Sequence, residues 1–192
     1  IEIYFTNHGT HPHTMHFHGF HKAEMDGSMP EQFVETGDTF IYEFKAEPRG
    51  LHLYHCHSTP LKEHIERGLY GMYIVDQKES REKANELIML MNAFDTDFDG
   101  ENEVYAVNSL AFYYMMYPIK VKKGELVRIY LGNMVEKDAI NSFHLHGNFF
   151  NQYKTGTRDI SDAYTDTLIL GQGERSILEI QFNNTGKFMF HA

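Results

Sequence analysis

Short apolar runs, rich in β-branched and aromatic residues, recur along most of the chain. Turn-forming residues separate them, as in Thr36-Gly37-Asp38 and Lys123-Gly124-Glu125, and this succession is typical of β-strands joined by tight turns. Many short strands with frequent turns predict a β-sandwich. The clearest strands are expected at residues 1–5, 39–44, 71–75, 126–131 and 176–182.

A charged segment interrupts this pattern near the middle of the chain. Residues 77–86 have the sequence QKESREKANE, which lacks an apolar run and is typical of a linker between domains. We therefore expect two domains, at 1–78 and 87–192. One short helix is compatible with residues 62–68.

A weak internal repeat lies on both sides of this linker. Each half contains a His-x-His-Gly segment, His16 to Gly19 in the first and His144 to Gly147 in the second. Each half then continues through a predicted strand to another that starts with Gly and carries His near its end, at 50–57 and 186–192. Two copies of one domain explain this order. The first copy starts close to its histidines and the second stops at its own, so we expect a fragment lacking the start of domain 1 and the end of domain 2.

Composition narrows the possible functions. The formal net charge is −10, whereas proteins that bind nucleic acids usually present a basic patch, so no nucleic-acid partner is expected. No apolar run is long enough to span a bilayer. The single cysteine excludes an internal disulfide. The 13 histidines form spaced clusters with apolar residues between them, unlike a contiguous histidine tract.

The triplet His55-Cys56-His57 contains that single cysteine. Successive side chains of an extended strand point to opposite faces, so Cys56 is expected to face away from both histidines. A soft thiolate suits one copper ion, and imidazoles on the other face suit further copper. The triplet therefore predicts metal sites on both sides of one strand.

The histidine face of this triplet has counterparts elsewhere in the chain. In any His-x-His strand both imidazoles share one face, and two such pairs facing each other can hold a small copper cluster. Each half of the chain supplies half of the set, so we expect the cluster at an interface between a domain 1 and a domain 2. The candidate ligands are His16, His18, His55, His57, His144, His146 and His191.

The cysteine face needs a different set of ligands. A blue-copper site uses two histidines, one cysteine and a weak axial group. His64 follows Cys56 across a turn, and His13 precedes His16 by a spacing that places it on the opposite face. Leu69 falls where an axial ligand would approach; because leucine cannot coordinate, we expect a raised copper reduction potential.

The pattern H-x-x-H-x-H-G, then H-C-H, then a further His followed by Gly-Leu resembles the multicopper oxidase family, the laccase-like cupredoxin proteins, over nearly the whole chain. The resemblance implies an all-β fold of two cupredoxin-like Greek-key β-sandwich domains. It also implies copper at two kinds of site. These are a type 1 copper at His13, Cys56 and His64, and a trinuclear centre with His16 and His144 as type 2 ligands and His18, His55, His57, His146 and His191 as type 3 ligands.

The family's activity is the implied function. Electrons from a small reducing substrate or an electron-donor protein enter at the type 1 site and pass through Cys56 to the trinuclear centre, where four of them reduce O2 to water. Asp26, before Gly27, resembles the family's acidic residue that assists proton delivery. Asn141 and Ala192 occupy the positions that match His13 and Cys56. This resembles two-domain laccases with type 1 copper only in domain 1, which form homotrimers with interface clusters. An extracytoplasmic location (periplasmic, secreted or cell-surface) is expected.

Two other functions remain open at this point. Copper nitrite reductases share the two-domain trimer, and their Cys-to-His spacing is nearer to that between Cys56 and His64. They have an acidic residue in place of His16 and a residue other than His in place of His57, which favours the oxidase. A non-catalytic copper-binding electron carrier would need only His13, Cys56 and His64.

Several other residues are interpreted without a metal role. His8, His11, His21 and His52 are assigned to the surface or to positions behind the ligands. The stretch Asp95 to Gly100 imitates the start of a calcium-binding EF-hand loop, but Ala106 stands where that loop needs a bidentate Glu. A solvated acidic turn is therefore the preferred interpretation.

Overall fold

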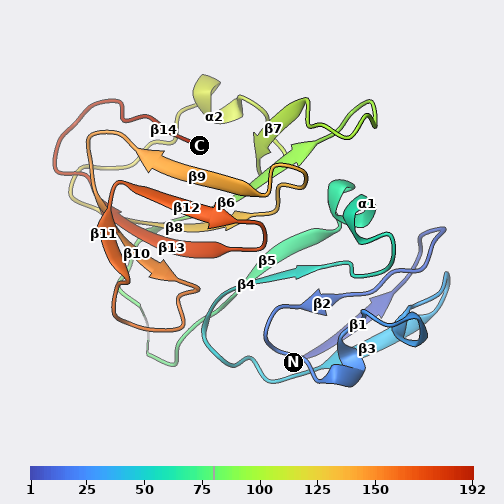
Figure 1. Cartoon of the computed structure of the whole chain (residues 1–192). Coiled ribbons are helices and arrows are strands. Elements are labelled where there is room, and N and C mark those ends of the chain that lie inside the picture. The colour runs from blue at the N-terminus through green and yellow to red at the C-terminus, as the bar shows by residue number, and fades with distance from the viewer. Residues whose placement is uncertain (80) are drawn as a thin grey trace. The chain divides into compact units, whose positions relative to one another are not determined.

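The computed structural model describes residues 1–79 and 81–192. The chain forms two compact units, Ile1–Val75 and Asp76–Ala192, and both consist mainly of β-strands (Figure 1). The predicted all-β fold is confirmed. None of the helices among the described residues has the length and apolarity that a membrane span requires.

The first unit contains two small antiparallel sheets. One joins β1 (Glu2–Thr6) to β3 (Thr39–Glu43), and the other has the order β2-β4-β5. Its core is aromatic: Phe17, Tyr42 and Phe44 are buried together and contact Tyr54 and Tyr73. The remaining elements are β2 (His16–Phe17), η1 (Ala23–Met25), η2 (Pro30–Gln32), β4 (Gly50–His55), α1 (Leu61–Glu66) and β5 (Tyr70–Val75).

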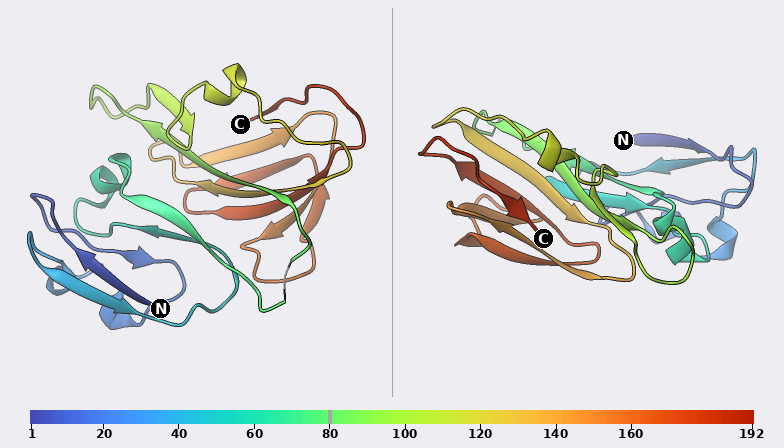
Figure 2. Two further views of the ribbon diagram at one scale, coloured as in Figure 1. Left: turned by 180° about the vertical axis from the view of Figure 1, so that it is seen from behind. Right: turned by 90° about the horizontal axis from the view of Figure 1, so that it is seen from above.

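The second unit is a sandwich of a larger and a smaller sheet, as Figure 2 shows. The six-stranded sheet has the order β11-β10-β13-β8-β6-β7, and the three-stranded sheet has the order β12-β9-β14. The elements are β6 (Asn85–Phe94), β7 (Val104–Val107), α2 (Tyr113–Met116), β8 (Leu126–Asn133), β9 (Ile140–Leu145), β10 (Phe150–Lys154), β11 (Ala163–Thr165), β12 (Thr167–Gly171), β13 (Arg175–Gln181) and β14 (Phe190–His191).

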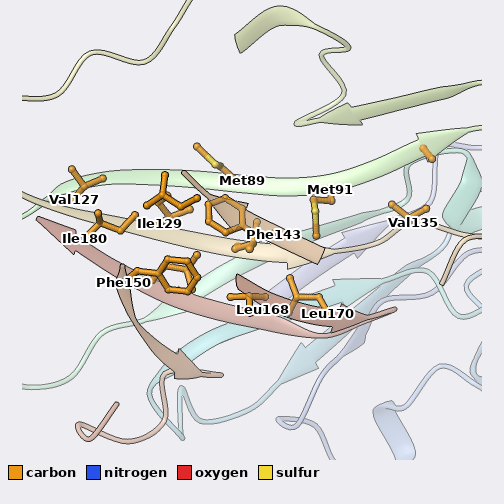
Figure 3. Packing of buried hydrophobic residues seen from close by; sticks show 14 residues of the cluster. Met89, Met91, Val127, Ile129, Val135, Phe143, Phe150, Leu168, Leu170 and Ile180 are labelled. Atoms are coloured by element: carbon orange, nitrogen blue, oxygen red, sulfur yellow. The ribbon is translucent and has the colours of Figure 1, made fainter. Parts of the chain in front are cut away.

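The core of the second unit determines which way its histidines point. Phe143 and Leu145 of β9 are buried and belong to one hydrophobic cluster with Ile129 and Leu178 of the facing sheet (Figure 3). Each such side chain contributes about 1.5–3 kcal/mol when fully buried. Because side chains alternate along a strand, this burial turns the intervening His144 to the opposite face.

The weak sequence repeat is also a structural repeat. β1 pairs with β3 as β8 pairs with β13, both antiparallel. The histidine-bearing strands follow the same rule: His16 lies opposite His55 in the β2–β4 pair, and His144 lies opposite His191 in the β9–β14 pair. β6 and β7 belong to the extra residues that precede the second copy.

The segment expected to be a linker is partly ordered against the second unit. The chain divides after Val75, and β6 already starts at Asn85; Ser80 lies outside the described residues. Arg128, buried in β8, donates hydrogen bonds to Glu86 (3.0 Å) and to Glu179 (2.8 Å). Glu86, at the end of this segment, is therefore a partner for a buried cation, a role that the charged sequence around it did not indicate. The short helix expected at 62–68 is present as α1.

Candidate metal centre

Three predicted ligands meet on one side of the His55-Cys56-His57 triplet. The sulfur of Cys56 lies 3.6 Å from His13 Nδ1 and 3.1 Å from His64 Nδ1, and the two Nδ1 atoms are 3.2 Å apart. His13 precedes β2 and forms an isolated β-bridge with Val34. Cys56 follows β4 directly, and His64 lies on α1. Three separate segments thus bring one thiol and two ring nitrogens to a single point.

Backbone hydrogen bonds hold the loop that carries two of these ligands. The N–H of Cys56 donates to the carbonyl of Leu69 (2.8 Å), and the N–H of Leu69 donates to the carbonyl of His64 (3.2 Å). Gly68, with φ of +81°, forms the turn after α1 that makes this return possible. The backbone of Leu69 is therefore adjacent to the ligand group. Its side chain has no atom that could bind a metal.

The surroundings of this group suit a soft metal ion. Cys56 and His64 are buried, and burial lowers the pKa of His13 and of His64 below the usual value. Both rings are therefore neutral at neutral pH, which is the form that binds a metal. One thiolate with two neutral imidazoles is the ligand set of blue-copper sites.

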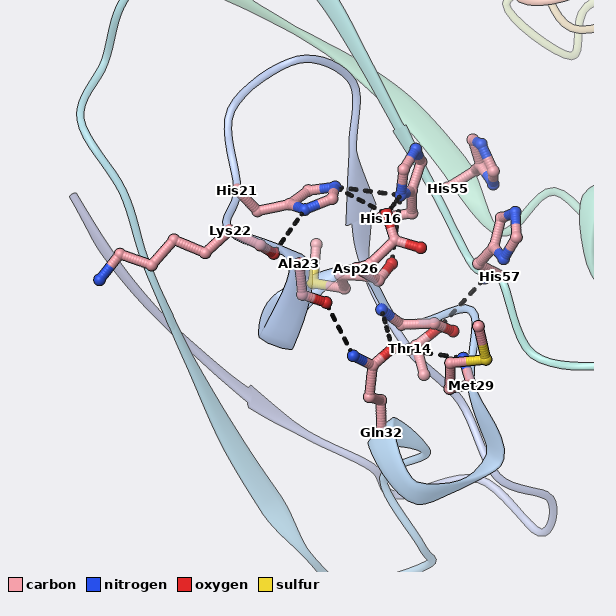
Figure 4. A network of polar contacts seen from close by, with 12 residues as sticks. Thr14, His16, His21, Lys22, Ala23, Asp26, Met29, Gln32, His55 and His57 are labelled. Atoms are coloured by element: carbon pink, nitrogen blue, oxygen red, sulfur yellow. Dashed lines mark hydrogen bonds and ion pairs between the residues drawn. The ribbon is translucent and has the colours of Figure 1, made fainter.

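The neighbours of Cys56 point away from this group. His55 joins His16 and His18, whose ligand atoms all lie within 4.8 Å of one another. The His57 ring centroid lies 5.1 Å from that of His16 and 5.5 Å from that of His55 (Figure 4). Four imidazoles thus gather on the second face, as the alternation of side chains predicts.

The second unit contributes a further group of three histidines. His144, His146 and His191 have ligand atoms within 4.8 Å of one another. The Nε2 atoms of His146 and His191 are 3.0 Å apart, although both side chains are exposed. The three imidazoles are therefore close together but open to solvent, so a second protein surface could supply further ligands.

Backbone carbonyls determine which ring nitrogen is available in the histidine groups. A carbonyl oxygen can only accept, so a ring nitrogen bonded to one must carry the hydrogen. His55 Nδ1 donates to the carbonyl of Cys56 (2.8 Å), His144 Nδ1 to that of Asp166 (3.1 Å), and His191 Nδ1 to that of Ala192 (2.6 Å). Each of these rings then offers Nε2 as a ligand atom, whereas the Cys56 group presents Nδ1.

The positions that depart from the repeat have other roles in the second unit. Asn141 corresponds to His13, and its side-chain amide donates to the carbonyl of Asp138 (2.9 Å). Ala192 follows His191 where Cys56 follows His55, so no sulfur ligand exists there. A thiolate-containing group is possible only in the first unit.

Asp26 lies behind the second histidine group. Its Oδ1 is 3.2 Å from His16 Nδ1 and 3.5 Å from His21 Nε2. A hydrogen bond with Ser28 is the main factor that lowers the pKa of Asp26, and His16 and His21 act in the same direction. The carboxyl group is therefore ionised at neutral pH, next to a candidate metal ligand.

The four histidines without an expected metal role lie in different surroundings. His8 and His11 are exposed. His52 is buried, with Nε2 3.0 Å from the Pro48 carbonyl. His21 contacts His16, its Nε2 lying 3.0 Å from His16 Nδ1. His21 lies in the turn after β2, where strand periodicity gives no signal for such a contact.

The acidic turn at residues 95–103 brings four carboxylates together. Asp95, Asp97, Asp99 and Glu103 have oxygens within 4.8 Å of one another. Asp95 forms an ion pair with Lys137 and accepts hydrogen bonds from backbone N–H groups of the same turn. Asp97 and Asp99 are exposed, as a solvated acidic turn requires, whereas the Asp95 side chain is only 3% exposed.

Family comparison accounts for both units. Residues 1–80 and residues 83–192 each match a family model described as multicopper oxidase. The chain belongs to the multicopper oxidase family. Members of this family are copper oxidoreductases, and the two units match the cupredoxin-like β-sandwich domains of multicopper oxidases, as the sequence resemblance implied.

Individual relatives include oxidases and a reductase. A crystal structure of a multicopper oxidase is 53% identical, with a TM-score of 0.95, over 99% of this chain and 68% of that one. The blue copper oxidase from Nitrosomonas europaea is 30% identical, with a TM-score of 0.84, over 99% and 65%. The copper-containing nitrite reductase of Neisseria meningitidis is 29% identical over 98% of this chain. The chain spans 53% of that reductase's length, about half.

The residues present fit copper as the multicopper oxidase family requires. The Cys56 group supplies a thiolate and two neutral imidazoles, and the other groups supply imidazoles with an available nitrogen. His57 Nδ1 is buried and has no hydrogen-bond partner among the described residues, so no protein group occupies this ring nitrogen.

Thr14 connects both ligand groups. It is 2% exposed, and its hydroxyl donates to the Gly27 carbonyl (3.1 Å) and accepts from the His57 N–H (3.1 Å). Gly27, at φ +76°, lies so close that an added Cβ would be 2.8 Å from Thr14 Cβ. Thr14 therefore ties the Asp26 loop to the strand that carries Cys56.

We predict that Thr14→Val destabilises the protein by about 1–3 kcal/mol, because the buried Gly27 carbonyl and the partly buried His57 N–H both lose their partner. Urea unfolding followed by circular dichroism measures the change. The control is Thr10→Val at an exposed site, for which we expect a change within about 0.5 kcal/mol. Equal stability of the Thr14 variant and the wild type would contradict this role of the hydroxyl.

Proposed function

We propose that the full protein is a laccase-like multicopper oxidase, which couples one-electron oxidation of a small donor to four-electron reduction of O2 to water. One observation carries the proposal: Cys56 meets His13 and His64 on one side of the triplet, while its neighbours meet His16 and His18 on the other. An extracytoplasmic location belongs to this proposal, since copper oxidases of this type are generally found there.

The proposed copper sites divide the ligands by chemistry. His13, Cys56 and His64 would hold a type 1 copper, and the remaining histidine groups would hold a trinuclear centre. Bound copper would supply the one-electron redox chemistry at both places. Within the trinuclear set, His16 and His144 are assigned to the type 2 ion, and His18, His55, His57, His146 and His191 to the type 3 pair.

The chain itself connects the two ligand groups and positions the residues around them. Peptide bonds join Cys56 to His55 and to His57, so a continuous covalent path of one residue links the two ligand groups. Burial of Cys56 and His64 limits the access of water to the thiolate group. Asp26 is within hydrogen-bond distance of His16, a position from which a carboxylate can pass protons toward the oxygen-reducing side.

The second unit carries an exposed face that matches an interface. Ile169 lies opposite Ser142, and both share a face with His144 because paired strand residues point to the same side. Ile140 is 78% exposed and Ile169 69% exposed on this face. Large exposed apolar residues beside an incomplete metal group indicate an interaction surface.

We propose that another copy of the chain covers this face with its His16, His18, His55 and His57 group. The contact then joins two different surfaces, and such head-to-tail contacts form a closed ring when the rotation between neighbouring copies closes. A homotrimer with one trinuclear centre at each interface covers the exposed face of every copy and forms a closed ring. This arrangement agrees with the two-domain laccases that the sequence resembles.

Nitrite reduction is the second candidate. The similarity to the Neisseria meningitidis copper-containing nitrite reductase extends over 98% of this chain. His16 and His57 favour the oxidase, because both take part in the histidine group that a trinuclear centre needs. A single type 2 copper would leave some of these imidazoles without use.

We predict that the full-length, copper-loaded protein consumes O2 with a phenolic one-electron donor, four donor molecules per O2. The balance is four electrons and four protons with O2 to give two waters. An oxygen electrode and donor absorbance measure this ratio. With the same donor under argon, nitrite should give no nitric oxide; rapid nitric oxide production without O2 consumption would establish the reductase instead.

We predict that Cys56→Ser abolishes the blue colour and donor oxidation, because a hydroxyl replaces the thiolate. The histidine groups are unchanged, so the trinuclear copper should remain bound. Optical spectra, EPR and copper content per chain measure these effects, with a loss of one copper from four. A variant that stays blue would refute the type 1 assignment.

We predict that Ile169→Glu dissociates the trimer and lowers the trinuclear copper content, while the blue type 1 site remains. A buried carboxylate at an apolar interface is strongly unfavourable. Light scattering with size-exclusion chromatography gives the oligomeric state. The matched control is Ile160→Glu, at a residue that is 80% exposed outside the strands; if both variants stay trimeric, this face is not the interface.

A further inference from the structure

We propose that His21 is a positioning residue for the proposed type 2 copper ligand His16: it holds His16 Nδ1 so that Nε2 faces the cluster. The inference rests on the proposed function, which assigns copper to His16. In this proposal His21 orients the ring of His16, whereas Asp26 passes protons.

Three acceptors surround one nitrogen of His16. His21 Nε2 lies 3.0 Å from His16 Nδ1, the Asp26 carbonyl 3.1 Å and Asp26 Oδ1 3.2 Å (Figure 4). The Asp26 carbonyl oxygen can only accept a hydrogen bond. His16 Nδ1 must therefore carry a hydrogen, and a neutral His16 has its free lone pair on Nε2.

The tautomer of His21 is determined in the same way. His21 Nδ1 is 3.1 Å from the Lys22 carbonyl and must donate to it. A neutral His21 then has its lone pair on Nε2, the atom that faces His16 Nδ1. The resulting chain of hydrogen bonds runs from His16 to His21 to the backbone, and it favours a single orientation of the His16 ring.

The loop that carries His21 and Asp26 is held by one side chain. Gln32 accepts from the N–H groups of Gly27 (3.0 Å) and Met29 (3.2 Å) and donates to the Ala23 carbonyl (2.9 Å). The His21 side chain is 8% exposed. It is therefore held in place behind His16.

The matching histidine of the second unit has an equivalent arrangement. His144 corresponds to His16, and its Nδ1 also faces an Asp carbonyl, that of Asp166 (3.1 Å). A second partner is the Thr167 hydroxyl (2.7 Å). Both proposed type 2 ligands thus combine an Asp carbonyl with side-chain partners, which are His21 and the Asp26 carboxylate for His16 and the Thr167 hydroxyl for His144. The imidazole of His21 is a specific feature of the first unit.

His21→Leu removes the acceptor and His21→Gln retains one near the position of Nε2. In the full-length, copper-loaded protein we expect His21→Leu to weaken type 2 copper binding about 10- to 100-fold, the usual effect of removing a partner of a metal ligand. We expect His21→Gln to restore most of it. Copper retained during dialysis against a graded chelator, together with the type 2 EPR signal, measures the affinity without any assay of turnover.

The blue type 1 absorbance and a His8→Leu control, at an exposed histidine, separate positioning from general damage. Selective loss of type 2 copper in His21→Leu, with a blue protein and an unaffected control, supports the inference. Unchanged type 2 copper, equal loss in the Gln variant, or loss of the blue colour as well would overturn it. A wild type without any type 2 signal would instead refute the proposed function, and this inference with it.

Discussion

The extended backbone at the end of β4 is the constraint on which the whole candidate site depends. It sends the Cys56 side chain toward His13 and His64 and the flanking His55 and His57 to the other side. This alternation follows from strand geometry and needs no metal. Because a one-residue change of register would exchange the two faces, the pairing of β4 with its neighbours protects both ligand groups together.

Apolar residues set the direction of the histidines in both units. Phe17, the middle residue of the first His-x-His segment, is buried among aromatic rings, and Leu145 is buried in the core of the second unit. Each anchors a strand so that the flanking imidazoles lie on the opposite face. The hydrophobic core therefore stabilises the sandwich and also sets the direction of the histidine side chains, whose own burial contributes little to stability.

Hydrogen bonds to carbonyl groups add a second level of order. They leave Nε2 available on His16, His55, His144 and His191, whereas the Cys56 group converges through Nδ1. This distinction is a tertiary property, because every residue has a carbonyl and sequence patterns do not show which one a ring will meet. The same reasoning separates His21, in contact with a ligand, from the exposed His8.

Local properties were sufficient for much of the molecule. The sequence by itself determined the all-β class, several of the strands, the repeat and the opposite directions of Cys56 and its two neighbours, because strand period and turn chemistry act over a few residues. It did not indicate that Glu86 would pair with the buried Arg128, and it left open whether His21 would lie at the surface or behind His16. Only the tertiary structure decided these contacts and the ring nitrogens available to a metal, because they depend on distant strands and on the path of a turn that has no period.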